Sequence, residues 1–193
     1  MSDVIVFGRL GFGHIADWQG YDHMLFLLAL CGGYTLKQWR SLLILVTAFT
    51  IGHSFSLALA TLNLVAFSAQ WVELLIPVTI ALTSISNLRP GSFSHGPRFG
   101  FRYAMAGIFG LIHGLGFSSY LQELLGGGSS ILLPLLGFNI GLEIGQLMIV
   151  GLIVLLGWAA IVVGRFPQRE WNVFLSGGAT ALAFLLISQN IFW

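Results

Sequence analysis

Charged residues and cysteine are both scarce in this chain. Only 8% of its 193 residues are Asp, Glu, Lys or Arg, whereas 56% are hydrophobic and the mean hydropathy is +0.90. A soluble domain carries roughly a quarter charged residues, so this composition predicts an integral membrane protein. The single cysteine, Cys31, excludes an internal disulfide and argues against a cysteine-based metal cluster. The net charge of +1, without a basic patch, argues against nucleic-acid binding.

The apolar runs predict an all-α, polytopic membrane protein with about six transmembrane helices in one domain, residues 1–193. A helix needs about 20 mostly apolar residues to cross the bilayer core. Such runs fall at about residues 19–36, 39–62, 70–88, 101–121, 131–163 and 171–191. The fifth run is long enough to be tilted, or broken near Gly137. Residues 1–18 are predicted to be a short outer lead-in, and they lack the basic head and long apolar core of a signal peptide.

Basic residues predict the orientation of these helices. Seven of the eight Lys and Arg residues fall in or beside three alternate connections: Lys37, Arg40, Arg89, Arg98, Arg102, Arg165 and Arg169. Short basic loops stay in the cytoplasm, so both termini are predicted to be periplasmic, with the chain in a bacterial inner (cytoplasmic) membrane. Arg9 is the exception.

Several ionisable residues lie in or beside the apolar runs, where they are costly and usually mark a pathway or a site. Imidazole and carboxylate together suit a divalent transition metal ion such as nickel, cobalt or zinc. We therefore predict a metal site formed by His14, Asp22, His23, His53, His113 and Glu143. The remaining histidine, His95, falls in a predicted cytoplasmic loop and is interpreted as solvated.

Helical spacing adds residues that could support the metal ligands. Residues three or four apart share a helix face, so Asn139, Glu143 and Gln146 form one polar stripe. Thr47, Thr50, His53 and Ser56 form another. Ligating histidines usually hydrogen-bond a second polar group, and we assign that role to Glu73, Asn139, Gln146, Thr50 and Ser56. Asp22 and His23 are adjacent, so either can be a ligand and the other its support. The glycines of GIFGLIHGLG and GLEIG are predicted to allow close helix packing.

Five segments resemble, in order, the conserved blocks of the HupE/UreJ family of membrane proteins. They are GHIADWQGYDHMLFLLAL, TAFTIGHSFSLALATL, VELLIPVTIALTSISNL, FGLIHGLGF and GFNIGLEIGQ. The resemblance covers about residues 11–146 and implies nickel or cobalt uptake, associated with hydrogenase or urease. It implies metal-binding roles for His14, Asp22 and His23, and functional roles for His53, Glu73, His113 and Glu143.

The chain departs from the family pattern at two places. Seven residues, rather than five, separate His14 from Asp22. The better-studied nickel permeases carry a second histidine and a glutamate after the fourth-helix histidine, where this chain has GLGFSSYL. The sequence therefore resembles the less characterised branch of the family.

Two functions fit these residues. The leading hypothesis is a divalent-metal permease of the nickel or cobalt type, with an outward-facing site of His, Asp and Glu. The alternative is an intramembrane zinc-dependent hydrolase acting on a lipid or similar substrate. In that enzyme Asp22 or Glu143 would be the general base and Ser56 would act beside the metal. A purely structural subunit would leave the buried ionisable residues unexplained. The expected partners are the metal ion and the bilayer; a homo-oligomer and partners in metalloenzyme maturation stay open.

Overall fold

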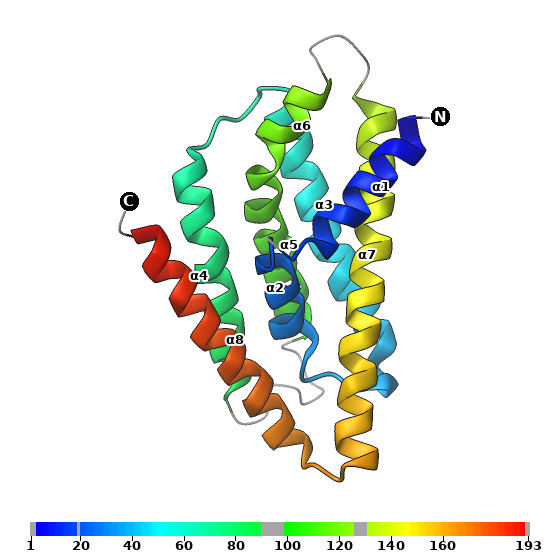
Figure 1. Cartoon of the computed structure of the whole chain (residues 1–193), viewed down its shortest axis with the longest axis vertical. Helices are drawn as coiled ribbons and strands as arrows, with labels where there is room; N and C mark the ends of the chain where they lie inside the picture. The colour runs from blue at the N-terminus through cyan, green and yellow to red at the C-terminus, as the bar shows by residue number, and fades with distance from the viewer. Residues whose placement is uncertain (1–2, 19, 90–98, 126–130, 192–193) are drawn as a thin grey trace.

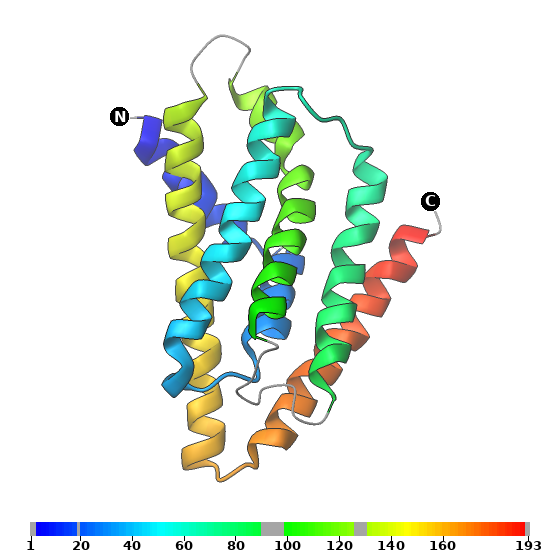
Figure 2. The same cartoon turned by 180° about the vertical axis from the view of Figure 1, so that it is seen from behind.

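The computed structural model describes residues 3–18, 20–89, 99–125 and 131–191, and all regular elements within them are helical. Figures 1 and 2 show a bundle of long helices. In chain order the helices are α1 (Asp3–Ala16), α2 (Asp22–Cys31), α3 (Trp39–Thr61), α4 (Ala69–Asn87), α5 (Phe99–Gly116), α6 (Ser118–Leu125), α7 (Leu132–Trp158) and α8 (Gln168–Ile191). A 3₁₀ turn at Leu36–Gln38 precedes α3, and a π-helical turn at Ala159–Val163 extends α7. The predicted all-α fold is confirmed.

Four helical segments are long and apolar enough to cross a membrane: Leu36–Thr61, Ala69–Asn87, Leu132–Val163 and Gln168–Ile191. The pair α5 and α6 is bent by 49° and forms a fifth crossing if it is counted as one broken span. The chain is therefore an integral membrane protein, and these five segments match five of the predicted runs. Most of the predicted loop at 89–98, with His95 and Arg98, and the loop at 126–130 lie outside the described residues.

The N-terminal part of the chain differs from the predicted lead-in and first span. The lead-in folds into α1, a helix of 14 residues, and α2 contains only ten residues of the predicted span. Neither reaches the length of about 20 residues that a crossing needs. In Figure 1, α1 runs from the end of the bundle near the N-terminus to its middle, and α2 continues toward the opposite end. Together they form a helix broken in the middle of the bundle.

Close packing against α7 explains why α1 is helical despite its glycines. A Cβ added to Gly11 would overlap the backbone carbonyl of Phe138, so the two backbones are in contact. This tertiary contact outweighs the weak helix propensity of glycine. The fifth run was expected to be tilted, or broken near Gly137; it is not broken there, because Gly137 packs against Val4 within an uninterrupted α7.

Helices α3 and α5 also pack backbone to backbone. A Cβ at Gly110 would overlap the carbonyl of Phe49, and one at Gly114 would overlap the carbonyl of His53. The predicted role of the glycines in GIFGLIHGLG is therefore confirmed. The contact between Gly114 and His53 also places His113, the residue before Gly114, at the level of His53 in the bundle.

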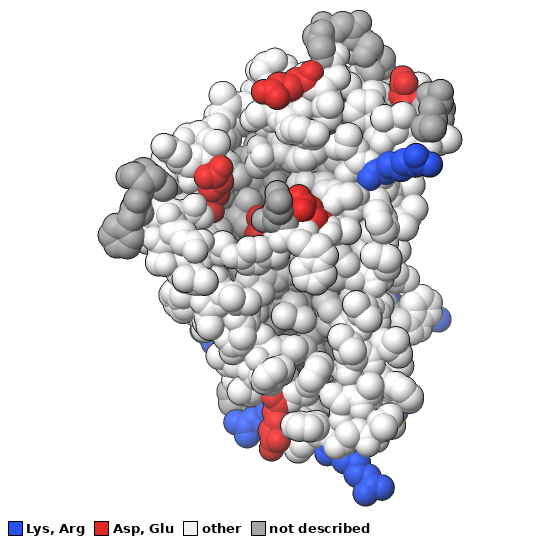
Figure 3. Space-filling model, in the orientation of Figure 1, with Lys and Arg blue, Asp and Glu red and all other residues white. Residues whose placement is uncertain are grey.

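The two ends of the bundle differ in charge. We call the end at which α2 leads to α3, α4 to α5 and α7 to α8 the basic end. In the described part of the chain it carries Lys37, Arg40, Arg89, Arg102, Arg165 and Arg169. Figure 3 shows most acidic side chains of one face in the half away from this end. Arg9, in α1, is the exception among the basic residues.

Candidate metal centre

The break between α1 and α2 places three predicted site residues in the bundle interior. His14 lies in the last turn of α1, and Asp22 and His23 form the start of α2. Asp22 is favourable there because a helix N-terminus attracts negative charge. The break therefore presents side chains from two helix ends to the helices that surround it.

Three histidines meet at this break. One ring nitrogen each of His14, His23 and His53 lies within 4.8 Å of the other two. The ring centroid of His14 is 4.6 Å from that of His23 and 6.1 Å from that of His53, and the centroids of His23 and His53 are 6.3 Å apart. The side chain of His53 is completely buried. We call these three residues the histidine triad.

Four buried ring nitrogens of the triad lack hydrogen-bond partners among the described residues. These are Nε2 of His14, Nε2 of His23 and both ring nitrogens of His53. Buried polar atoms are nearly always paired, so four unpaired nitrogens in one place require an explanation. A metal ion would supply it, since three neutral imidazoles can hold a divalent transition metal and leave one position open.

The spacing of the triad fits an ion after a small adjustment. With metal–nitrogen bonds of about 2.0–2.1 Å, ligands around a tetrahedral ion lie about 3.3 Å apart. Nitrogens at the 4.8 Å limit would have to approach one another by up to about 1.5 Å to bind one ion, a movement that side-chain rotation can supply.

Asp22 is placed to orient His23. Its Oδ1 accepts a hydrogen bond from Nδ1 of His23 at 3.0 Å and another from the backbone N–H of His23 at 2.8 Å. A proton on Nδ1 leaves the lone pair of Nε2 free, and this is the nitrogen without a partner. Carboxylate, imidazole and metal commonly form such a chain. The geometry therefore favours Asp22 as the support and His23 as the ligand.

His113 lies beside the triad rather than within it. Its ring centroid is 5.1 Å from that of His23, and its Nε2 is 3.4 Å from the hydroxyl of Thr79. That hydroxyl donates to the carbonyl of Ile76 at 2.7 Å, so it can only accept a hydrogen bond from His113. Nδ1 of His113 then keeps its lone pair and has no described partner. His113 is thus a buried base next to the triad.

Comparison with known protein families agrees with this arrangement of histidines. The family model described as HupE / UreJ protein matches residues 1–192, which is almost the whole chain. The chain belongs to the HupE/UreJ family. No curated protein and no solved structure matches it significantly. In this HupE/UreJ protein, the first and second of the five family-like segments supply the histidine triad, and the fourth supplies His113 beside it.

The polar stripe of α7 pairs with the stripe of α3 away from the triad. Thr47 donates to Oε1 of Glu143 at 3.0 Å, and Thr50 donates to Oε1 of Gln146 at 2.7 Å. Such interhelical hydrogen bonds hold membrane helices together. Glu143 is not among the groups that converge within 4.8 Å in the described part of the chain.

Two further residues predicted as supports make no described hydrogen bond to the triad nitrogens. The hydroxyl of Ser56 donates to the carbonyl of His53 at 3.1 Å within its own helix. Oδ1 of Asn139 is buried and has no partner among the described residues. These contacts give neither Ser56 nor Asn139 a role at the metal centre.

Replacing Glu143 by glutamine should leave metal affinity within about twofold of wild type, because the carboxylate faces Thr47 and not the triad. The variant should lose at most about 1 kcal/mol of stability, the usual range for an interhelical hydrogen bond in a membrane. Titration of the purified protein with Co²⁺ and a thermal melt in detergent would measure both. A loss of bound metal in this variant would make Glu143 a ligand after all.

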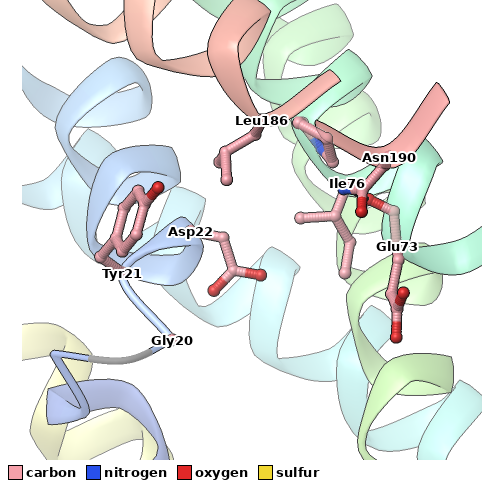
Figure 4. A pocket seen from close by; sticks show the side chains of 8 residues that line it. Gly20, Tyr21, Asp22, Glu73, Ile76, Leu186 and Asn190 are labelled. Atoms are coloured by element: carbon pink, nitrogen blue, oxygen red, sulfur yellow. Dashed lines mark hydrogen bonds between the residues drawn. The ribbon is translucent and has the colours of Figure 1, made fainter. Parts of the chain in front are cut away.

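Two cavities reach the triad region from the side away from the basic end. One, of about 180 Å³, is lined by Gly20, Tyr21, Asp22, Glu73, Ile76, Pro77, Leu186 and Asn190. Figure 4 shows Asp22 extending from the start of α2 into this space, with Glu73 and Asn190 on its far side. The other, of about 460 Å³, is lined by Leu10, Gly13, His14, Asp17, Phe117 and Tyr120. Each cavity therefore reaches the break and carries at least one carboxylate.

Aromatic rings surround the histidines, and they were not predicted from the sequence. The ring of Phe117 is 4.2 Å from His14, and the ring of Phe138 is stacked on His53 at 6.3 Å. On the opposite side, Phe26 and Phe49 lie 5.0 Å and 5.2 Å from His113. A signal was present, because Phe26 follows His23 by one helical turn and Phe49 precedes His53 by one turn.

Proposed function

We propose that this HupE/UreJ protein is a permease for a divalent transition metal ion of the nickel or cobalt type. The observation that carries the proposal is the histidine triad, with its unpaired nitrogens at a break between two short helices. Broken helices that place an ion site in the bundle interior recur in membrane transporters. The family resemblance to nickel and cobalt uptake proteins points the same way.

The proposed orientation places the basic end in the cytoplasm. If α1 with α2 and α5 with α6 each count as one broken crossing, the chain crosses six times. Both termini then lie on the outer side, and so do the two cavities that lead to the break. In a bacterium, the corresponding membrane is the inner membrane.

Under this proposal the outer cavities collect the ion and the triad binds it. The carboxylates of Asp17, Asp22 and Glu73 attract a cation to the entrances. The ion then exchanges its water for the nitrogens of His14, His23 and His53. Asp22 keeps His23 in the protonation state that can bind, and it offsets part of the ion's charge in the membrane.

Transport by the reconstituted protein tests the proposal. The purified chain is placed in liposomes that contain a metal-sensitive fluorescent chelator, and Ni²⁺, Co²⁺ or Zn²⁺ is added outside. Wild type should show saturable influx of at least one of these ions, whereas His53→Ala should reduce its rate at least about tenfold. Equal influx into wild-type and protein-free liposomes would refute the permease.

A second candidate is an intramembrane zinc-dependent hydrolase. It is favoured by one observation: the triad offers three nitrogens and leaves room for a metal-bound water, as in catalytic zinc sites. Zinc that stays bound through purification, with no influx of any metal and with cleavage of a lipid ester or amide, would establish this function. Loss of that cleavage in His53→Ala would tie it to the triad.

A further inference from the structure

Three helices repeat the same order of side chains on the side of the triad that faces the basic end. α2 carries His23, then Phe26 and then Leu30. α3 carries His53, Phe49 and Leu45, and α5 carries His113, Phe109 and Met105. Each step is three or four residues, which is one helical turn, and α3 and α5 run opposite to α2. The bundle therefore stacks a layer of histidines, a layer of phenylalanines and a third apolar layer.

The phenylalanine layer closes the triad region toward the basic end. The ring of Phe26 lies 4.9 Å from that of Phe49 and 6.0 Å from that of Phe109. Phe26 and Phe49 are buried, and both touch His113. An ion leaving the triad in this direction meets the faces and edges of these three rings.

A cavity begins directly beyond the phenylalanine layer. It has a volume of about 290 Å³ and is lined by Leu30, Leu45, Met105 and Phe109 near the layer, and by Leu82, Thr83, Ser86, Asn87 and Arg102. Asn87 is the last residue of α4, and Arg102 lies in the first turns of α5, so the cavity extends to the basic end. One layer of rings thus separates a metal centre from a space that leads to the other side.

Resting on the permease function, we propose that Phe26, Phe49 and Phe109 are the inner gate and that this cavity is the exit of the metal ion. Hydrophobic constrictions gate channels by excluding water, and a small rotation of the rings opens them. Arg102 raises the energy of a cation in the cavity, so the ion passes through the cavity and does not settle there. The triad is then the single binding station, with the gate beneath it.

If these three rings form the gate, two substitutions should change the rate of metal influx into liposomes in opposite directions. Phe49→Ala removes the central ring and should raise metal influx about tenfold. Met105→Trp fills the exit cavity one turn below the gate and should lower influx at least about tenfold. Both variants should bind metal at the triad with an affinity within about twofold of wild type, which also verifies that they are folded.

Phe138→Ala is the matched control. Phe138 is as buried as Phe49 and also contacts His53, but it belongs to α7 and does not line the exit cavity. Its loss should not raise influx, because the three rings of the gate stay in place. Unchanged influx in both Phe49→Ala and Met105→Trp, with wild type active, would overturn the gate and leave the permease intact. If wild type binds metal but passes none, the permease itself fails.

Discussion

Replacing His53 by alanine should abolish stable metal binding. Both ring nitrogens of His53 are buried without a hydrogen-bond partner among the described residues, and one of them belongs to the triad. Its removal leaves two nitrogens, His14 and His23, on helix ends that are free to separate. Loss of a neighbouring support group alone costs about 10–100-fold in metal affinity, so loss of a ligand should exceed about 100-fold. Metal content after purification and titration with Co²⁺ would measure the change.

His95→Ala is the control for this experiment. The sequence predicts His95 to be a solvated loop residue, so its removal should leave the bound metal unchanged. A second variant for comparison is His113→Ala. It removes a buried histidine that lies next to the triad but is not one of the three converging groups. If His53→Ala keeps its full metal content, the triad does not bind the metal and its histidines serve in helix packing.

Replacing Asp22 by asparagine should weaken metal binding by about 10–100-fold without removing a ligand. The amide keeps the size of the side chain but loses the charge that holds the proton on Nδ1 of His23. Nε2 of His23 then becomes a poorer ligand, although the number of nitrogens around the metal stays the same. Titration gives the affinity, and X-ray absorption of the cobalt-loaded protein gives the number of ligands.

Asp17→Asn is the matched control for Asp22→Asn. Asp17 lines the other outer cavity and is not one of the three groups that converge in the described part of the chain. Its neutralisation should slow metal capture at low salt and leave the equilibrium affinity within about threefold of wild type. If Asp22→Asn instead loses one oxygen ligand in the absorption spectrum, Asp22 binds the metal directly and the support role is wrong.

The sequence predicted most of the helices because length and apolarity are enough to define a membrane crossing. α3, α4, α7 and α8 begin and end within a few residues of the predicted runs. The N-terminal region was different, since glycines made α1 look unstructured and the apolar run after Asp22 looked like a full span. Packing of α1 on α7 and the break before α2 depend on neighbours that are far away in the sequence.

The residues that converge in the bundle were also predicted in part. His14, His23 and His53 were among the expected ligands, and the structure brings their nitrogens together. The separation of His14 from Asp22 by seven residues is compatible with a shared site, because these residues include the break between α1 and α2. Glu143 was grouped with the ligands because buried carboxylates are costly. Its bond to Thr47, six residues from His53 along α3, could not be foreseen from spacing within α7.

The sequence by itself determined that the protein is an α-helical membrane protein whose scarce ionisable groups suit a divalent metal. Hydrophobicity and residue type suffice for this, since each acts locally along the chain. Only the tertiary structure decided which of those groups converge, that Asp22 supports His23, and that a phenylalanine layer separates the triad from a cavity at the basic end. These features depend on the relative rotation and depth of helices, which are set by glycine contacts between distant segments.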